Sequence, residues 1–147
     1  LNSFKSIRDF AEKINATEAR LDVLINNAGY AQYLKKEVSV DGIEMTMATN
    51  HYGPFLLTHM LIDLMKKTAK TDPCRIVVVS SITHNLSFFN PTKPYHLNPL
   101  NYFLPILLYN STKFANILFT FELARRLQGT NIIANCLHPG KLIKNHT

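Results

Sequence analysis

Three short apolar runs lie along the chain, at residues 21–25, 75–79 and 131–137. The first two are rich in β-branched residues and stop abruptly at small polar residues. This pattern is typical of parallel strands that are buried on both faces. The third run is less uniform, and we interpret it as a further strand. The apolar pattern therefore predicts three short parallel strands.

The segments between the runs carry apolar residues at helical spacing. A first helix is predicted with Asn2 or Ser3 as its N-cap and an apolar stripe at Phe4, Ile7, Phe10, Ala11 and Ile14. Asp41 and Glu44 lie three residues apart and resemble a capping box, which would open a second helical region running to about Lys67.

A third helix is predicted from Tyr109 to Gln128, with Gly129 as its stop. Its apolar stripe passes through Ile117, Phe121, Ala124 and Leu127. Residues 88–108, just before it, are rich in proline and aromatic residues, and this density of proline argues against regular structure.

Helices that alternate with strands predict an α/β fold with a parallel sheet. In such sheets ligands bind at the carboxyl ends of the strands. Asn27, Ser81 and the Pro139-Gly140 pair each follow a predicted strand. We therefore expect these residues to lie at one edge of the sheet and to border a site.

Tyr109 and Lys113 are four residues apart, so they share one face of the third helix. A tyrosine hydroxyl loses its proton near pH 10 in water, and a nearby ammonium favours the phenolate. Such a pair can act as a general acid or base. The alternative is a half-buried tyrosine beside a solvated lysine, because so short a motif arises often by chance. The catalytic interpretation is favoured because the pair occurs together with other polar and glycine-containing motifs in a fixed sequence order, namely residues 26–29, Asn50, residues 80–81 and residues 139–140.

This ordered set resembles the short-chain dehydrogenase/reductase family. The resemblance covers nearly the whole chain, and residues 21–29, 49–58, 114–119 and 122–127 are most similar to the retinol dehydrogenase group. Residues 91–93 and 108–110 are also similar to the WW-domain-containing oxidoreductase. The resemblance implies one partial domain over residues 1–147, with a Rossmann-like doubly wound parallel sheet.

Four catalytic roles follow from the resemblance. Tyr109 would exchange a proton with the substrate oxygen, and Lys113 would hold the nicotinamide ribose and favour the phenolate. Ser81 would hydrogen-bond the carbonyl oxygen, and Asn50 would hold a water that links Lys113 to solvent. Taken singly, Ser81 could be a turn residue after a strand, and Asn50 a polar residue on a helix flank.

The resemblance also implies a nicotinamide cofactor, with NADP favoured and NAD possible. The cofactor-binding residues would be Asn27, Ala28, Gly29, Tyr109, Lys113, Pro139, Gly140 and Leu142. A small residue and a glycine after the first strand would permit close approach of the backbone to the ligand. The chain departs from the family pattern at Lys144, where a Thr or Ser is usual, so one hydroxyl contact to the cofactor is in doubt.

The family's Gly-rich turn, which seats the pyrophosphate on a helix N-terminus, has no counterpart among the five widely spaced glycines. We therefore expect a fragment without the first strand-helix-strand portion and without the C-terminal substrate region. In a sheet of order 3-2-1-4-5-6 the three strands would be the last three. The strand at 21–25 would then be an open edge, so we expect the 147-residue chain neither to bind NAD(P) measurably nor to stay a soluble monomer.

Charge, cysteines and histidines narrow the function further. The net charge of +6 is scattered in pairs of basic residues, which argues against a nucleic-acid partner. Two cysteines are too few for a disulfide framework and indicate reduced residues of an intracellular protein. The resemblance to the retinol dehydrogenase group implies a cytoplasmic or endoplasmic-reticulum-associated location. The histidine spacing suits no zinc site. No apolar run has membrane-spanning length, so an anchor like that of related retinol dehydrogenases would lie upstream of Leu1.

Two classes of function remain. The first is an oxidoreductase that interconverts an alcohol and a carbonyl, with residues 88–108 as an apolar wall for a lipophilic, retinoid- or steroid-like substrate. In the alternative, that stretch is a surface loop. The second class is a non-catalytic interaction or regulatory fragment that cannot hold the cofactor. The resemblance implies that the complete protein is a homodimer through the helices at 41–67 and 109–128, which are rich in apolar residues, including Met60, Leu61, Leu64 and Phe119.

Overall fold

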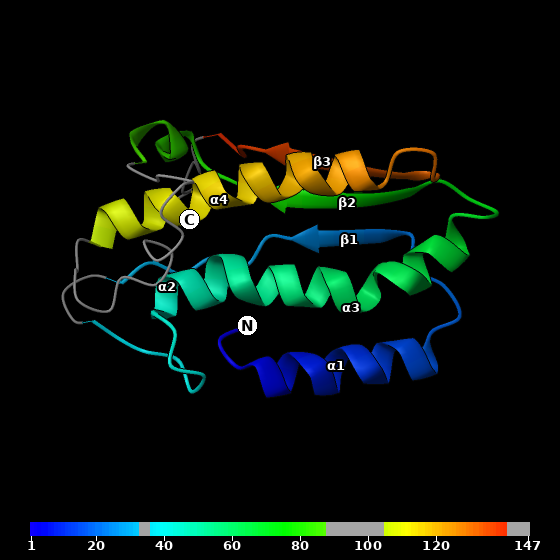
Figure 1. The fold of residues 1–147 in the computed structure, drawn as a ribbon, viewed down its shortest axis with the longest axis horizontal. Helices are drawn as coiled ribbons and strands as arrows, with labels where there is room; N and C mark the ends of the chain where they lie inside the picture. The colour runs from blue at the N-terminus through cyan, green and yellow to red at the C-terminus, as the bar shows by residue number, and fades with distance from the viewer. Residues whose placement is uncertain (33–35, 88–104, 141–147) are drawn as a thin grey trace, which may run out of the picture.

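The computed structural model describes residues 1–32, 36–87 and 105–140, and in these ranges helices alternate with strands (Figure 1). The elements in order are α1 (Phe4–Thr17), β1 (Val23–Asn26), α2 (Met45–Met47), the π-helix η1 (Ala48–Tyr52), α3 (Gly53–Thr68), β2 (Cys74–Val79), the 3₁₀ helix η2 (Ile82–Leu86), α4 (Pro105–Arg126) and β3 (Ile132–Leu137).

The three described strands form one parallel sheet in the order β1-β2-β3. Val23 pairs with Arg75, and Cys74 pairs with Ile132. The predicted parallel strands are confirmed to within two residues at each end. Because the strands run the same way, their carboxyl ends meet at one edge of the sheet. Among the described strands, β1 lies at the side of the sheet, as the predicted strand order requires.

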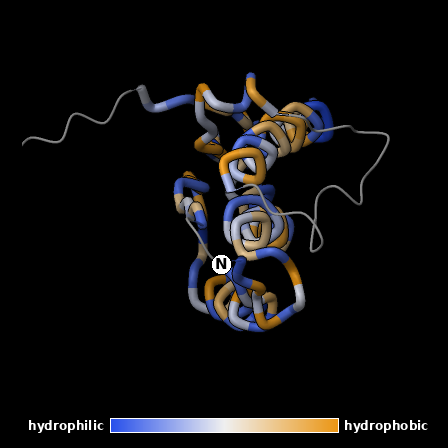
Figure 2. Tube along the Cα trace, turned by 90° about the vertical axis from the view of Figure 1, so that its left-hand side faces the viewer, coloured by the Kyte–Doolittle hydropathy of each residue, from blue (hydrophilic) through white to orange (hydrophobic). Residues whose placement is uncertain are grey.

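Helices α1, α3 and α4 lie side by side in one layer on one face of the sheet (Figures 1 and 2). The core between this layer and the sheet is apolar, with Met65 from α3, Ile76 and Val78 from β2, and Phe119 and Leu123 from α4. Helix α1 packs against α3 rather than against the sheet. The buried positions therefore recur with period two along each strand.

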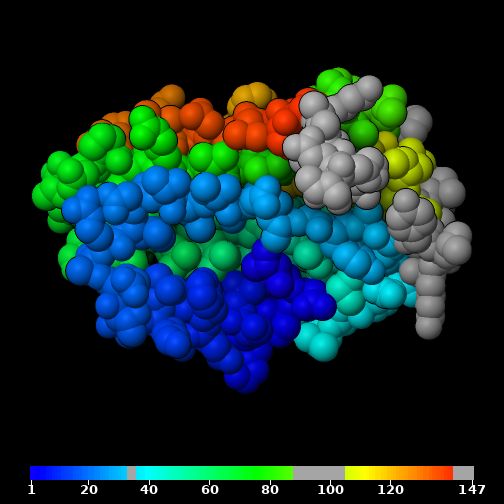
Figure 3. Space-filling view, turned by 180° about the vertical axis from the view of Figure 1, so that it is seen from behind, coloured from blue at the N-terminus to red at the C-terminus, as the bar shows by residue number. Residues whose placement is uncertain are grey.

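The opposite face of the sheet carries no described helix, and Figure 3 shows the strands at the molecular surface there. The side chains of Val23, Ile25 and Ile133 are 48%, 60% and 50% exposed, whereas Ile76 on the covered face is 0% exposed. The prediction that the first two strands are buried on both faces is wrong for β1, and in β2 Arg75 is exposed while Val77 and Val79 are half-buried. The reason is that every long described helix packs on the same side of the sheet.

The N-terminal ends of the helices decide between the two predicted caps of the first helix and correct the predicted capping box. Ser3 caps α1 by accepting a hydrogen bond from the Ser6 N–H at 3.3 Å. The capping box at Asp41 is wrong, because Glu44 is itself the N-cap and accepts from the N–H groups of the second and third residues after it, each at 2.8 Å. Asp41 instead accepts from the Phe4 N–H at 2.8 Å, at the first turn of α1. The second helical region therefore begins at Met45.

Helix α4 begins at Pro105, earlier than the predicted Tyr109. A proline at this position is compatible with a helix because the first turn needs no N–H from it. Residues 88–104 lie outside the described ranges. Gly129 has φ +79° just beyond the helix end, as predicted for its stop. The predicted apolar stripe is wrong at Phe121, which is 69% exposed. Three residues assigned to a dimer contact are instead buried within the chain, namely Leu61, Leu64 and Phe119.

The two faces of the sheet predict opposite outcomes for the same substitution. Ile76→Thr removes apolar volume from the core and buries a hydroxyl, so we expect it to lower the free energy of unfolding by about 2 to 4 kcal/mol. Ile25→Thr lies on the open face, and we expect a change within about 0.5 kcal/mol. Urea unfolding of the 147-residue chain, with both variants at the same low protein concentration, measures the two changes. Equal losses for the two variants would contradict the one-sided packing.

Candidate active site

Lys113 is the centre of the candidate site. Its ammonium lies 5.4 Å from the centroid of the Tyr109 ring, so the four-residue spacing brings the two together as predicted. The Lys113 residue is only 3% exposed. Its Nζ donates to the Val79 carbonyl at 3.1 Å, and its own carbonyl accepts from the Ser80 hydroxyl at 2.8 Å. These two reciprocal bonds fix α4 against the end of β2.

Burial sets the electrostatics of this lysine. The pKa of Lys113 is lowered from its ordinary value because desolvation disfavours the ammonium, with a weaker opposing effect from the nearby Cys136 thiol. Burial also raises the pKa of Cys136. Lys113 therefore loses its proton at lower pH than a solvated lysine, which sets an upper pH limit on the positive charge beside Tyr109.

The loop after β1 faces the same ammonium. A Cβ atom added at Gly29 would lie 3.7 Å from the Lys113 Nζ, so the bare glycine backbone borders the lysine directly. Asn27 and Ala28 lie in this exposed loop. An ammonium has three donors, and within the described residues Lys113 commits one of them, to Val79. The remaining donors suit hydroxyl groups of a ligand in the space beside Gly29.

Asn50 lies in the π-helix η1 and is 1% exposed. Its Oδ1 accepts from the Tyr30 N–H at 2.7 Å, and its Nδ2 donates to the Tyr30 carbonyl at 2.8 Å. The same Nδ2 donates to the Thr112 hydroxyl at 3.2 Å, and that hydroxyl donates to the Tyr109 carbonyl at 2.7 Å. The Asn50 side chain thus joins the loop after β1 to the helical turn that carries the Tyr109 and Lys113 pair.

A second polar contact joins η1 to α4. Asn116 donates from its Nδ2 to the Asn50 carbonyl at 3.0 Å, and its Oδ1 lies 3.0 Å from the His51 Nδ1. Sequence reasoning missed Thr112 and Asn116, together with Ser80 and His51. The signal that could have found the first two is their four-residue spacing on α4, which places them on one face.

Ser81 lies where β2 ends and caps η2, the short helix that packs against α4. Its hydroxyl oxygen accepts from the Thr83 N–H at 3.3 Å and from the Thr83 hydroxyl at 3.2 Å. Both bonds use the oxygen as an acceptor, so the Ser81 proton is left for donation. The residue is half-buried. A hydroxyl in this state can donate to an oxygen of a bound molecule.

The carboxyl end of β3 is described only in part. Pro139 and Gly140 follow this strand, and Gly140 has φ +84°, a left-handed conformation that favours glycine. Leu142 and Lys144 lie outside the described residues, so their cofactor contacts stay predictions.

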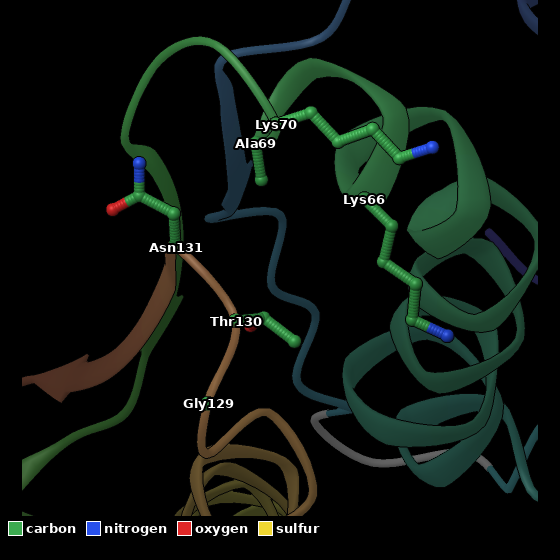
Figure 4. A pocket seen from close by; sticks show the side chains of 6 residues that line it. All are labelled: Lys66, Ala69, Lys70, Gly129, Thr130 and Asn131. Carbon is green, nitrogen blue, oxygen red and sulfur yellow. The ribbon is translucent and has the colours of Figure 1, made fainter.

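A surface pocket of about 350 Å³ lies at the other end of the sheet (Figure 4). It is lined by Lys66, Ala69, Lys70, Gly129, Thr130 and Asn131. None of the predicted site residues lines this pocket, and Asn131 precedes β3 rather than following it. Within the described ranges we find no cluster of His, Cys, Asp and Glu that could hold a metal ion, and no helix with the length and apolar character of a membrane span.

The chain matches known proteins over most of its length. A family model described as short chain dehydrogenase matches residues 1–93. The chain is 48% identical to retinol dehydrogenase 14 of Homo sapiens, over 95% of this chain and 40% of that protein. It is 39% identical to the chloroplastic short-chain dehydrogenase TIC 32 A of Brassica napus, over 99% of this chain and 46% of that protein. It therefore spans less than half the length of these relatives.

Solved structures give the same result for the fold. An uncharacterised protein from Mycobacterium paratuberculosis has a TM-score of 0.79 and 36% identity, over 99% of this chain and 49% of that chain. The RhlG/NADP active-site complex of Pseudomonas aeruginosa has a TM-score of 0.69 and 24% identity, over 97% of this chain and 51% of that chain. The three-stranded parallel sheet thus corresponds to about half of a Rossmann fold.

The buried His51 predicts acid sensitivity. Burial lowers the pKa of His51 below its ordinary value near 6.5, although the bond to Asn116 partly opposes this shift. Below pH 6.5 the unfolded chain therefore binds a proton that the folded chain does not, and the free energy of unfolding falls as the pH falls. We expect a slope of up to about 1.4 kcal/mol per pH unit until the folded-state pKa is reached.

The free energy of unfolding in urea, measured at about every half pH unit between pH 7.5 and pH 5, tests this slope. His51→Asn keeps an N–H donor toward Asn116 and removes the titration, so its acid loss should be smaller. His59→Asn, at an exposed histidine of α3, is the matched control and should keep the acid loss of the unmodified chain. An unchanged slope in His51→Asn would show that other groups cause it.

Proposed function

Because the chain belongs to the short-chain dehydrogenase family, we propose that it carries the catalytic part of an NAD(P)-dependent oxidoreductase that interconverts an alcohol and a carbonyl. The observation that carries this proposal is the buried Lys113 ammonium beside Tyr109, held at the carboxyl edge of the sheet. A structural lysine would gain more by reaching solvent than by staying 3% exposed. Its position next to a tyrosine and an open glycine backbone favours a chemical role.

In this proposal Tyr109 gives its hydroxyl proton to the substrate oxygen, or takes it back in the reverse direction. Lys113 stabilises the negative charge that is left on the tyrosine oxygen. The Ser81 hydroxyl donates a hydrogen bond to the same substrate oxygen and stabilises the charge that develops there. Asn50 keeps the Tyr109–Lys113 turn in place through Thr112, and we propose that it also borders a water path from Lys113 to solvent.

The residues around Lys113 fit a nicotinamide cofactor. The spare donors of Lys113 suit ribose hydroxyls, and the bare backbone at Gly29 leaves room beside them. Asn27 and Ala28 would border the adenosine side, while residues 139–140 and Leu142 would border the nicotinamide. Such a cofactor supplies or accepts the hydride of the reaction. Resemblance to the retinol dehydrogenase group favours NADP over NAD.

Substrate, assembly and location follow from the relatives by analogy. The name of retinol dehydrogenase 14 supports a lipophilic alcohol or carbonyl, retinoid- or steroid-like, as the substrate. We propose a homodimer of the whole protein through α3 and α4, where Phe55 and Phe121 are among the exposed apolar side chains, 41% and 69% exposed. We propose a cytoplasmic or endoplasmic-reticulum location and a single partial domain over residues 1–147.

A second candidate is a non-catalytic interaction or regulatory role. The observation in its favour is the wide spacing of the glycines in these 147 residues, which provide no Gly-rich turn for a pyrophosphate. Such a chain could keep the Tyr109 and Lys113 pair and yet fail to hold the cofactor. It would then act through its surfaces, and substitutions at the pair would have no functional effect.

Tyr109→Phe tests the catalytic role in the whole protein. Only the proton-transferring hydroxyl is lost, so we expect kcat to fall by about 10²- to 10⁴-fold while the cofactor Kd stays nearly the same. Lys113→Ala should impair both kcat and cofactor binding. Tyr52→Phe removes a hydroxyl from another half-buried tyrosine and should leave kcat unchanged. A normal kcat in Tyr109→Phe would refute the assignment.

The 147-residue chain alone is expected to bind NADPH too weakly to measure, because it lacks a Gly-rich anion site. It is also expected to self-associate through the open side of β1 and the exposed face of the sheet. Calorimetric titration with NADPH and gel filtration measure these two properties. Saturable micromolar binding by a monodisperse monomer would contradict the expectation.

A further inference from the structure

Pro54 leaves one backbone carbonyl of the site without its helical partner. In an α-helix the Asn50 carbonyl would accept from the N–H of the residue four positions later, and that residue is Pro54, which has no N–H. Just before it the helix widens, because the Gly53 N–H bonds to the Ala48 carbonyl five residues back. Asn50 is 1% exposed, and its carbonyl accepts a hydrogen bond from outside its own helix.

Asn116 supplies that donor from α4. Its Nδ2 lies 3.0 Å from the Asn50 carbonyl oxygen, and the Asn116 residue is only 4% exposed. A carbonyl can only accept, so the amide must turn its nitrogen toward Asn50 and its oxygen toward His51. His51 then has to carry its proton on Nδ1, 3.0 Å from the Asn116 oxygen. The Asn50 carbonyl thereby fixes which way the amide faces, and the amide selects the His51 tautomer.

We infer that Asn116 is a positioning residue for the catalytic turn, with His51 as its second hydrogen-bond partner. Its amide donates to the carbonyl that Pro54 cannot reach. This bond holds η1 at the position along α4 where the Asn50 side chain donates to the Thr112 hydroxyl. The Thr112 hydroxyl in turn donates to the Tyr109 carbonyl. The position of η1 along α4 therefore determines where the helical turn that carries Tyr109 lies. Lys113 has its own bonds to β2 and does not depend on this contact.

This inference rests on the proposed function for its kinetic part. Asn116→Leu removes both hydrogen bonds at similar side-chain size, and in the whole protein we expect kcat to fall by about 10- to 100-fold. The cofactor Kd should stay nearly unchanged, because Lys113 is held separately. Thr120→Val is the matched control, since Thr120 is 2% exposed on the same helix and its hydroxyl donates to the backbone carbonyl of Asn116, so its loss leaves both side-chain bonds of Asn116 in place. It should leave kcat unchanged.

A rescue separates positioning from general loss of structure. Pro54→Ala restores the missing backbone N–H, so the double variant Pro54→Ala/Asn116→Leu should recover most of the lost kcat. Asn116→Asp keeps the volume and the acceptor for His51 and serves as the second variant if Asn116→Leu does not fold. A double variant no faster than Asn116→Leu, or an equal kcat loss in Thr120→Val, would overturn the inference.

Hydrogen exchange keeps this test distinct from that of the proposed function. In the whole protein, the amides of residues 50–53 and of Phe55 should exchange at least about tenfold faster in Asn116→Leu than in Thr120→Val. Unchanged exchange there would overturn the inference even if the enzyme assignment holds. A normal kcat in Tyr109→Phe would instead refute the enzyme assignment and leave the exchange result as the measure of the Asn116 contact.

Discussion

The candidate site depends on the two hydrogen bonds that join Lys113 to the end of β2. Removing an ammonium from water is costly unless polar groups replace the lost hydration. Val79 provides a carbonyl for the charge, and the neighbouring Ser80 hydroxyl holds the Lys113 backbone. Because both partners follow directly from the strand, the sheet itself decides where the lysine and Tyr109 lie.

Helix α4 divides its buried face between two tasks. The part of the helix up to Asn116 buries polar side chains, with Thr112, Lys113 and Asn116 each less than 5% exposed, and the part that follows buries the apolar Phe119 and Leu123. The apolar half secures the helix on the sheet, while the polar half holds η1 and the loop after β1 through directional bonds. Buried polar networks of this kind are stabilising only when their members are satisfied, which explains why one amide can matter to the whole turn.

The sheet shows a second constraint. Parallel sheets are normally covered on both faces, yet the described helices cover only one. The chain spans 49% of a solved relative with the same fold, and a doubly wound fold exposes one sheet face when only part of its helices is present. Val23, Ile25 and Ile133 are thus apolar residues on the sheet face that parallel folds normally cover.

The sequence by itself determined the alternation of helices and strands, the parallel sheet and the face shared by Tyr109 and Lys113. These features depend on local periodicity and spacing, which the chain encodes residue by residue. Tertiary structure alone decided that Glu44 rather than Asp41 caps the second helical region and that Phe121 is exposed. It also decided that Thr112 and Asn116 face η1. A buried polar side chain breaks the apolar pattern that marks a core face, so its partner is known only once the two helices are packed together.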